Sequence, residues 1–265
     1  MAHDRPSGVR ARRTTGLAGA LMWIAGLVDA VGFVLLSRVF TANMSGNAIH
    51  FGMEWGHGQW SRGATRIVAI AAFFLGGMVA EVLHEAGRRR SWPSRGLAAT
   101  LVAEGVLLVA FVVAAAACLG WDAGRRTNGP ALLGLVALAA AAMGTQNASL
   151  RRAGRVRIHT THITGELTQV SREVVERAYA WSDRRHGRPE STRGGPGARG
   201  IVRLAAFWAA YVLGAIMGTW GLDTWGLRVL VAPVALLVAL VAVTLAWGLD
   251  LGDGGGRDRS RWHVS

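Results

Sequence analysis

The sequence predicts an all-α integral membrane protein: six transmembrane helices arranged as two inverted three-helix repeats with polar half-helix motifs. Three observations predict this fold: long apolar windows, arginines concentrated in alternate connections, and an internal repeat. A helix needs roughly 20 mostly apolar residues to cross a bilayer. The six windows that come close to this length or exceed it, with few charged residues, are 15–36, 67–83, 97–119, 130–150, 201–222 and 227–249.

Arginine placement orients the chain. Arginine-rich segments follow the second and fourth windows and flank the first and last, whereas the other connections hold few. Because cytoplasmic loops of membrane proteins are enriched in Arg and Lys, this pattern predicts six spans with both termini in the cytoplasm. Topology thus explains the formal charge of +13 without nucleic-acid binding. The single cysteine, Cys118, has no partner for an internal disulfide.

The chain divides into a cytoplasmic N-tail (1–14), a first three-span repeat (15–119), a second three-span repeat (130–249) and a cytoplasmic C-tail (250–265). Within the second repeat, residues 182–200 are polar and rich in Gly, Pro and Arg. Such a segment has too little apolar surface to offset the entropy lost on ordering, which predicts a flexible cytoplasmic linker.

Three matches recur in the same order in both halves. The run GLVDA at 26–30 matches GTQNA at 144–148, and TANMSGN at 41–47 matches TTHITGE at 160–166. Three spans is an odd number, so the two halves face opposite ways across the membrane, a plan common among secondary transporters with a site where the repeats meet. The third match places small residues every four positions, at Ala72, Gly76 and Ala80 and at Ala210, Gly214 and Gly218.

Two of these runs resemble the YoaK-like family of uncharacterised bacterial membrane proteins. The first is GLVDAVGF at 26–33 followed by FTANMSGN at 40–47 and Gly52, and the second is MGTQNA at 143–148 followed by THITG at 161–165. The resemblance extends over residues 16–249 and implies a multi-pass inner-membrane protein. It implies no particular substrate or activity.

The repeated polar motifs are the predicted lining of a binding site. A carboxylate at Asp29, inside the first helix, costs about 2.5–3.5 kcal/mol on insertion scales, so it is either functional or hydrogen-bonded to backbone to orient a helix. The 43–47 run is either a broken or re-entrant helix whose amides face a solute, or a loop and helix cap outside the bilayer. We expect Asp29 to be the titratable centre of the site. The predicted lining is Asp29, Asn43, Ser45, Asn47, Asn147, Thr161, Thr164 and Glu166.

Other polar residues carry weaker predictions. Glu104, in the third window, either pairs with an Arg or His inside the bundle or relays protons. His159, His162 and Glu166 have the spacing of metal ligands, but the repeat already accounts for polar residues at two of these positions, so no metal or other cofactor is predicted. No Ser-His-Asp set, phosphate loop or dinucleotide fingerprint is visible, and the chain is not expected to be an enzyme.

The leading functional prediction is transport or permeation of a small solute or ion through a site at the repeat interface. The alternative is a non-transporting scaffold or sensor whose Arg-rich cytoplasmic segments bind anionic lipid or a partner. A hydrated cavity at the motifs favours transport, and dry packing favours the scaffold. Small-residue faces let helices approach closely in a bilayer, either within the protein or in a homodimer, and both remain open.

Overall fold

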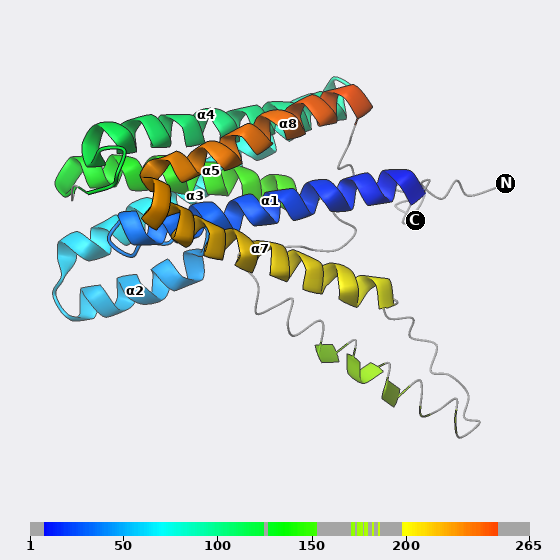
Figure 1. The fold of residues 1–265 in the computed structure, drawn as a ribbon, viewed down its shortest axis with the longest axis horizontal. Helices are drawn as coiled ribbons and strands as arrows, with labels where there is room; N and C mark the ends of the chain where they lie inside the picture. Colours follow the sequence, from blue (N-terminus) through cyan, green and yellow to red (C-terminus); the bar gives the residue numbers. More distant parts are fainter. Residues whose placement is uncertain are drawn as a thin grey trace, which may run out of the picture.

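The computed structural model describes residues 8–124, 127–152 and 198–248, with a few further residues between 171 and 185. All regular structure in this part of the chain is helical, as predicted (Figure 1). The predicted C-tail, most of the predicted linker and half of the predicted N-tail lie outside the described residues. The helices are α1 (Gly8–Leu35), α2 (Met44–Gly56), α3 (Trp60–Arg89), α4 (Pro93–Leu119), α5 (Gly129–Arg152), α7 (Ala198–Trp225), the 3₁₀ turn η1 (Gly226–Leu230) and α8 (Val231–Trp247).

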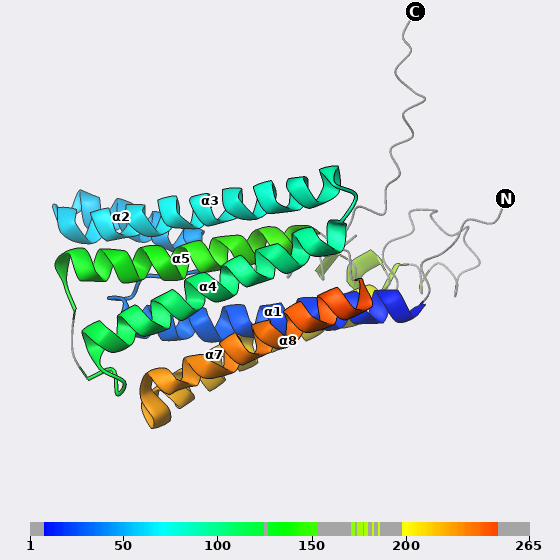
Figure 2. The ribbon, with the colours of Figure 1, turned by 90° about the horizontal axis from the view of Figure 1, so that it is seen from above.

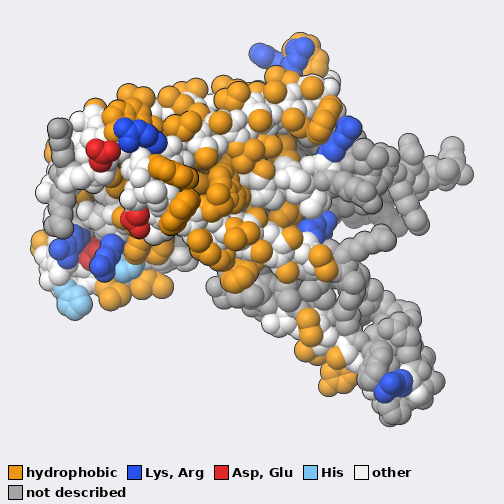
Figure 3. Space-filling model, in the orientation of Figure 1, with side chains coloured by type: hydrophobic (Ala, Val, Ile, Leu, Met, Phe, Trp, Pro, Cys, Tyr) orange, Lys and Arg blue, Asp and Glu red, His pale blue; other side chains and the backbone are white. Residues whose placement is uncertain are grey.

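Five stretches of the described helices are long and apolar enough to cross a membrane. The last of them, Val202–Trp247, contains most of α7 together with η1 and α8, and the chain reverses direction at η1 (Figure 1). The second predicted window, 67–83, is the middle of a longer helix, α3, because its charged ends are also helical. Apolar side chains cover much of the visible surface (Figure 3). The fold is that of a multi-pass membrane protein.

The bundle is built around α1 and α5, the most buried of the candidate spans. α1 packs chiefly against α7, and α5 packs against α3 and α4, while α4 also contacts α8 (Figure 2). Most of the largest fully buried side chains come from α1, α4 and α5, and they include Leu21, Met22, Leu101, Phe111, Leu135 and Met143. The first helix of each predicted half is therefore central.

Two helix pairs approach closely through glycines. A Cβ added at Gly26 of α1 would overlap the carbonyl oxygen of Tyr211 on α7, and one at Gly144 of α5 would overlap that of Phe73 on α3. The reciprocal contacts join Gly214 to Trp23 and Gly76 to Ala141. In the repeat alignment, Gly26 corresponds to Gly144 and Tyr211 to Phe73. Residue pairs at equivalent positions of the repeat thus join α1 to α7 and α5 to α3.

The chain turns back on itself after α1. Ser37 and Arg38 have left-handed backbone angles, φ 54° and 62°, which reverse the chain direction at the helix end. Residues 36–43, the return segment, then run back along α1 until Thr41 hydrogen-bonds to Asp29. Asp29 lies six positions before Leu35, the last residue of α1, so α2 begins about 9 Å back from the end of α1. From there α2 runs beside α3 toward the end of the bundle where α3 begins (Figures 1 and 2).

Candidate functional site

Asp29 hydrogen-bonds to two other segments, the return segment and α7, and so connects both to α1. It is 3% exposed, and its Oδ1 accepts hydrogen bonds from the backbone N–H groups of Thr41 (2.6 Å) and Ala42 (2.8 Å) and from the Thr41 hydroxyl (3.1 Å). Its Oδ2 accepts from the phenol of Tyr211 on α7, at 2.8 Å. All four groups are donors, which suits an ionised carboxylate because that group only accepts. Asp29 therefore ties the return segment to α1, and α1 to α7.

Asn43 begins the half-length helix α2. Its Oδ1 accepts from the backbone N–H of Gly46 (3.2 Å) and from the hydroxyl of Ser45 (2.9 Å). Side-chain caps of this kind satisfy one of the free amides at a helix start and stabilise the helix by about 1 kcal/mol. Ser45 is exposed on the outside of this first turn.

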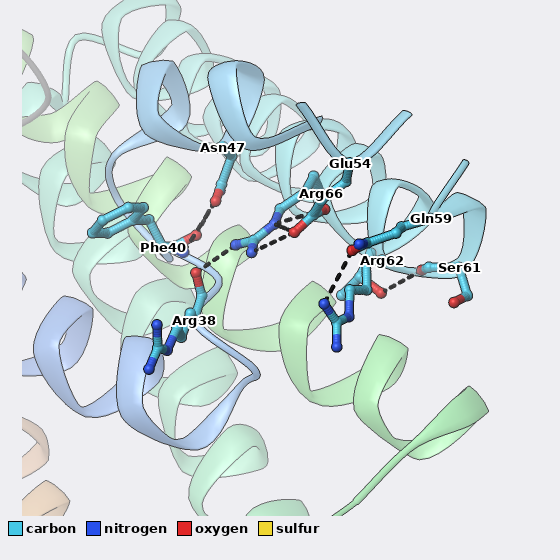
Figure 4. A network of polar contacts seen from close by, with 9 residues as sticks. Arg38, Phe40, Asn47, Glu54, Gln59, Ser61, Arg62 and Arg66 are labelled. Carbon is cyan, nitrogen blue, oxygen red and sulfur yellow. Dashed lines mark hydrogen bonds and ion pairs between the residues drawn. The ribbon is translucent and has the colours of Figure 1, made fainter. Parts of the chain in front are cut away.

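Asn47 on α2 also binds the return segment, through the backbone of Phe40. The side chain is fully buried, donating through Nδ2 to the carbonyl of Phe40 (2.7 Å) and accepting at Oδ1 from the Phe40 N–H (3.0 Å). Figure 4 shows this contact beside the neighbouring ion pair. Because the return segment is neither helix nor sheet, its backbone groups need such partners. Asn47 replaces the hydrogen bonds that a regular element would supply.

An ion pair extends the same network toward α3. The guanidinium of Arg66 on α3 contacts the Glu54 carboxylate on α2 at 3.0 Å, with both side chains largely buried, and it donates to the carbonyl of Arg38 (Figure 4). Removing one partner of a buried pair costs about 3–5 kcal/mol, because the other charge is left uncompensated. Arg66 thus joins α2, α3 and the return segment.

The equivalent contact, between α5 and α3, is chemically different. Asn147 on α5 stands where α1 has Asp29, and Phe73 on α3 stands where α7 has Tyr211. The carboxylate and the phenol that hydrogen-bond where α1 meets α7 are thus both replaced where α5 meets α3. Next to Asn147, Gln146 donates to the carboxyl of Glu104 on α4 at 2.8 Å.

The structure brings together four of the predicted lining residues. Asp29, Asn43, Ser45 and Asn47 belong to one hydrogen-bonded unit formed by α1, the return segment and α2. Asn147 lies separately on α5. Thr161, Thr164 and Glu166, like His159 and His162, lie outside the described residues.

Sequence reasoning did not assign Thr41, Tyr211, Glu54 or Arg66 to the site. The repeat did contain a signal for Tyr211. The helix that packs against Asp29 has tyrosine at this position, whereas the helix that packs against Asn147 has Phe73 there. Glu54 and Arg66 lie outside the repeated motifs, and no pattern in the sequence pairs them.

Comparison with known proteins agrees with the helical membrane fold. No solved structure matches the chain. Over 163 residues it is 28% identical to the UPF0700 transmembrane protein YoaK of Bacillus subtilis (strain 168), an alignment that covers 62% of this chain and 68% of that protein. This confirms the resemblance to YoaK-like proteins. The family described as "protein of unknown function (DUF1275)" matches residues 17–243, and the chain therefore belongs to this family.

Proposed function

We propose that the protein transports a small polar solute or ion through a site between two inverted three-span halves. The observation that carries this proposal is the interruption between α1 and α2. Non-helical backbone at membrane depth is tolerated only where it is buried in protein or lines a wet cavity. Transporters use such interrupted helices to direct helix ends at a substrate near the bilayer midplane.

The depth of the interruption follows from the length of α2. Trp55 and Trp60 flank the turn between α2 and α3, and tryptophans favour the membrane–water interface. α2 has 13 residues and runs along α3 (Figure 2). Its first residue therefore lies about 20 Å below that interface, within a hydrocarbon core about 30 Å thick.

The reciprocal glycine contacts support the six-span inverted repeat. Equivalent residues join the first helix of each half to the second span of the other, as a two-fold relation between the halves requires. The reversal at η1 supports counting α7 and α8 as two crossings. With arginines marking the cytoplasmic side, the proposal places both termini in the cytoplasm and the site at the crossing of α1 with α7 and α5 with α3.

In this proposal the lining residues have unequal roles. Ser45 is exposed at the first turn of α2, where free backbone amides favour a polar or anionic group. Asn43 positions Ser45, and Asp29 positions the whole return segment, because four protein donors already occupy its oxygens. Asn147, Thr161, Thr164 and Glu166 are the proposed contribution of the second half.

Reporter fusions test the six-span topology. We expect cytoplasmic reporters fused after Arg90 and after Gly195 to be active, and a fusion after Gly124 to report the outer side. The reason is the arginine asymmetry, together with the position of Arg90 and Gly124 beyond opposite ends of α4. If the Arg90 and Gly124 fusions report the same side, the six-span count and the inverted repeat are both wrong.

Thiol labelling tests the transport site itself. In a protein with Cys118→Ser, we expect Ser45→Cys to react with a small charged thiol reagent, because a transport site must be reached by water. A solute that slows this reaction and also raises the unfolding temperature of the wild type is the candidate substrate, since a ligand of the folded state stabilises it. The matched controls are Phe74→Cys, 66% exposed on the apolar surface of α3, and Gly124→Cys, in the loop after α4.

The second candidate function, a non-transporting membrane scaffold, is favoured by the packing of the first motif. Asp29, Thr41 and Asn47 are at most 3% exposed, and their side chains are hydrogen-bonded within the protein. Protection of Ser45→Cys equal to that of Phe74→Cys, in both intact and permeabilised cells, would contradict transport and support the scaffold.

A further inference from the structure

Among the described residues, Glu104 is the most buried acidic side chain outside the first motif. It lies 11 residues into α4 and is 0% exposed, and Leu101 and Leu108, one turn away on either side, are also fully buried. A charge at such a position is costly unless a cation or several donors compensate it. Within the described residues no Arg or His forms an ion pair with Glu104, so the predicted Arg or His partner is absent from this part of the chain.

Hydrogen bonds distinguish Glu104 from Asp29. Glu104 receives a single bond, from Gln146 to Oε1, and its Oε2 has no partner among the described residues. Asp29, with comparable burial, receives four. One donor leaves most of a carboxylate charge uncompensated, whereas a neutral acid has no charge to compensate and leaves only its O–H group without an acceptor. The surroundings of Glu104 therefore fit the protonated acid.

The helices packed around α4 supply little charge. α8 contains no ionisable residue, and α5 contains none from Gly129 to Leu150. The buried ionisable groups of α3 are Arg66, paired with Glu54, and His84. His84 lies beside Gly96, two helical turns from Glu104 toward the start of α4. On η1, Arg228 lies at the opposite end of α4, where it pairs with Asp122.

A second polar atom without a partner lies on α8. The hydroxyl of Thr244 is fully buried and has no hydrogen-bond partner among the described residues. α4 contacts α8, and at one end of this pair the N–H of Leu227 in η1 donates to the carbonyl of Trp121 in the loop after α4. From that end Glu104 and Thr244 lie at similar depths, about 24 Å and 21 Å along their helices. Glu104 and Thr244 thus each keep one buried polar atom without a described partner at similar depth, and such an atom calls for an explanation, such as a bound species.

We propose that Glu104 binds a proton in the resting protein and exchanges it with water during the transport cycle. The step is the loss of H⁺ from the carboxylic acid to water when the contact between α4 and α5 opens, and its return when that contact closes. A metal cation fits less well, because Ca²⁺ or Mg²⁺ takes six or more oxygen ligands, and Glu104 offers one open oxygen. Through Gln146, the neighbour of Asn147, this site touches the repeated motif of the second half. The coupling to transport rests on the proposed function.

Infrared spectroscopy of the purified protein in a detergent without ester or carboxyl groups tests the proton. At neutral pH exposed carboxyl groups are ionised, so a C=O stretching band of a carboxylic acid reports a buried, protonated group. We expect this band in the wild type, its loss in Glu104→Gln, and its retention in the matched variant Asp29→Asn. We expect the band to disappear reversibly on raising the pH, which shows exchange with water. In Gln146→Leu it should shift to higher wavenumber, because its carbonyl loses a hydrogen bond.

Three results would overturn the proposal. They are a wild type without the band, a band unchanged in Glu104→Gln, and a band that persists at every pH at which the protein stays folded. If Glu104→Gln does not fold, the shift in Gln146→Leu decides whether the band belongs to Glu104. Failure of the proposed transport function can be distinguished from failure of this inference. The first is measured by the thiol reactivity of Ser45→Cys, which does not depend on the infrared band.

Discussion

Gly144→Ala is expected to lower the free energy of unfolding by about 3 kcal/mol, the upper end of the usual cost of overpacking. The added methyl group would overlap the backbone carbonyl of Phe73, and backbone cannot rotate away as a side chain can. α5 and α3 would have to separate along their whole contact. Gly26→Ala, which meets the carbonyl of Tyr211, should have the same effect on α1 and α7. Equilibrium unfolding in mixed detergent micelles measures both.

The chain offers matched controls for these substitutions. A Cβ at Gly134 of α5 or at Gly105 of α4 meets no atom within 4 Å. Alanine at either position should leave stability unchanged or raise it by up to about 1 kcal/mol, through its higher helix propensity. If Gly144→Ala proves as stable as Gly134→Ala, the close approach of α3 and α5 described above is wrong.

Asp29→Ala is expected to destabilise the protein by about 2–6 kcal/mol. It leaves the buried N–H groups of Thr41 and Ala42 without an acceptor, at about 1–3 kcal/mol each, in addition to the released hydroxyls. Asp29→Asn keeps one carbonyl acceptor and should cost less, about 1–3 kcal/mol for the lost charge. Tyr211→Phe removes one donor without exposing another group and should cost about 1 kcal/mol.

Thermal unfolding of the three variants in one detergent gives their order of stability directly. The role described for Asp29 requires Asp29→Ala to be the least stable. Equal stability of Asp29→Ala and Tyr211→Phe would show that the return segment keeps its conformation without the carboxylate. Asp29→Asn also separates the two acidic groups, because a pH dependence that originates at Glu104 should survive in it.

The features predicted correctly from the sequence are those that depend on neighbouring residues. Apolar window length identified the membrane class, and contiguous motifs such as residues 26–30 identified the family. Helix ends were less accurate: α3 continues well beyond the window 67–83 because a helix can extend into charged interfacial sequence.

The contacts that were missed join residues far apart in the chain. Tyr211 reaches Asp29 across 182 positions, and Arg66 reaches the carbonyl of Arg38 across 28. Such pairings depend on how helices pack, which no local pattern encodes. The same reason explains Glu104: its burial was predicted from its window, whereas its partner on α5 was not.

The crosswise packing of the two halves has a consequence for biosynthesis. α1 is made first, yet its main neighbour, α7, follows some 180 residues later. A chain synthesised at about 5–20 residues per second therefore carries Asp29 without its Tyr211 partner for about 9–36 seconds. During that interval Thr41 and Ala42, only 12 and 13 residues further along, are already available. The return segment thus gives the nascent chain a local means of satisfying its first intramembrane carboxylate before the second half exists.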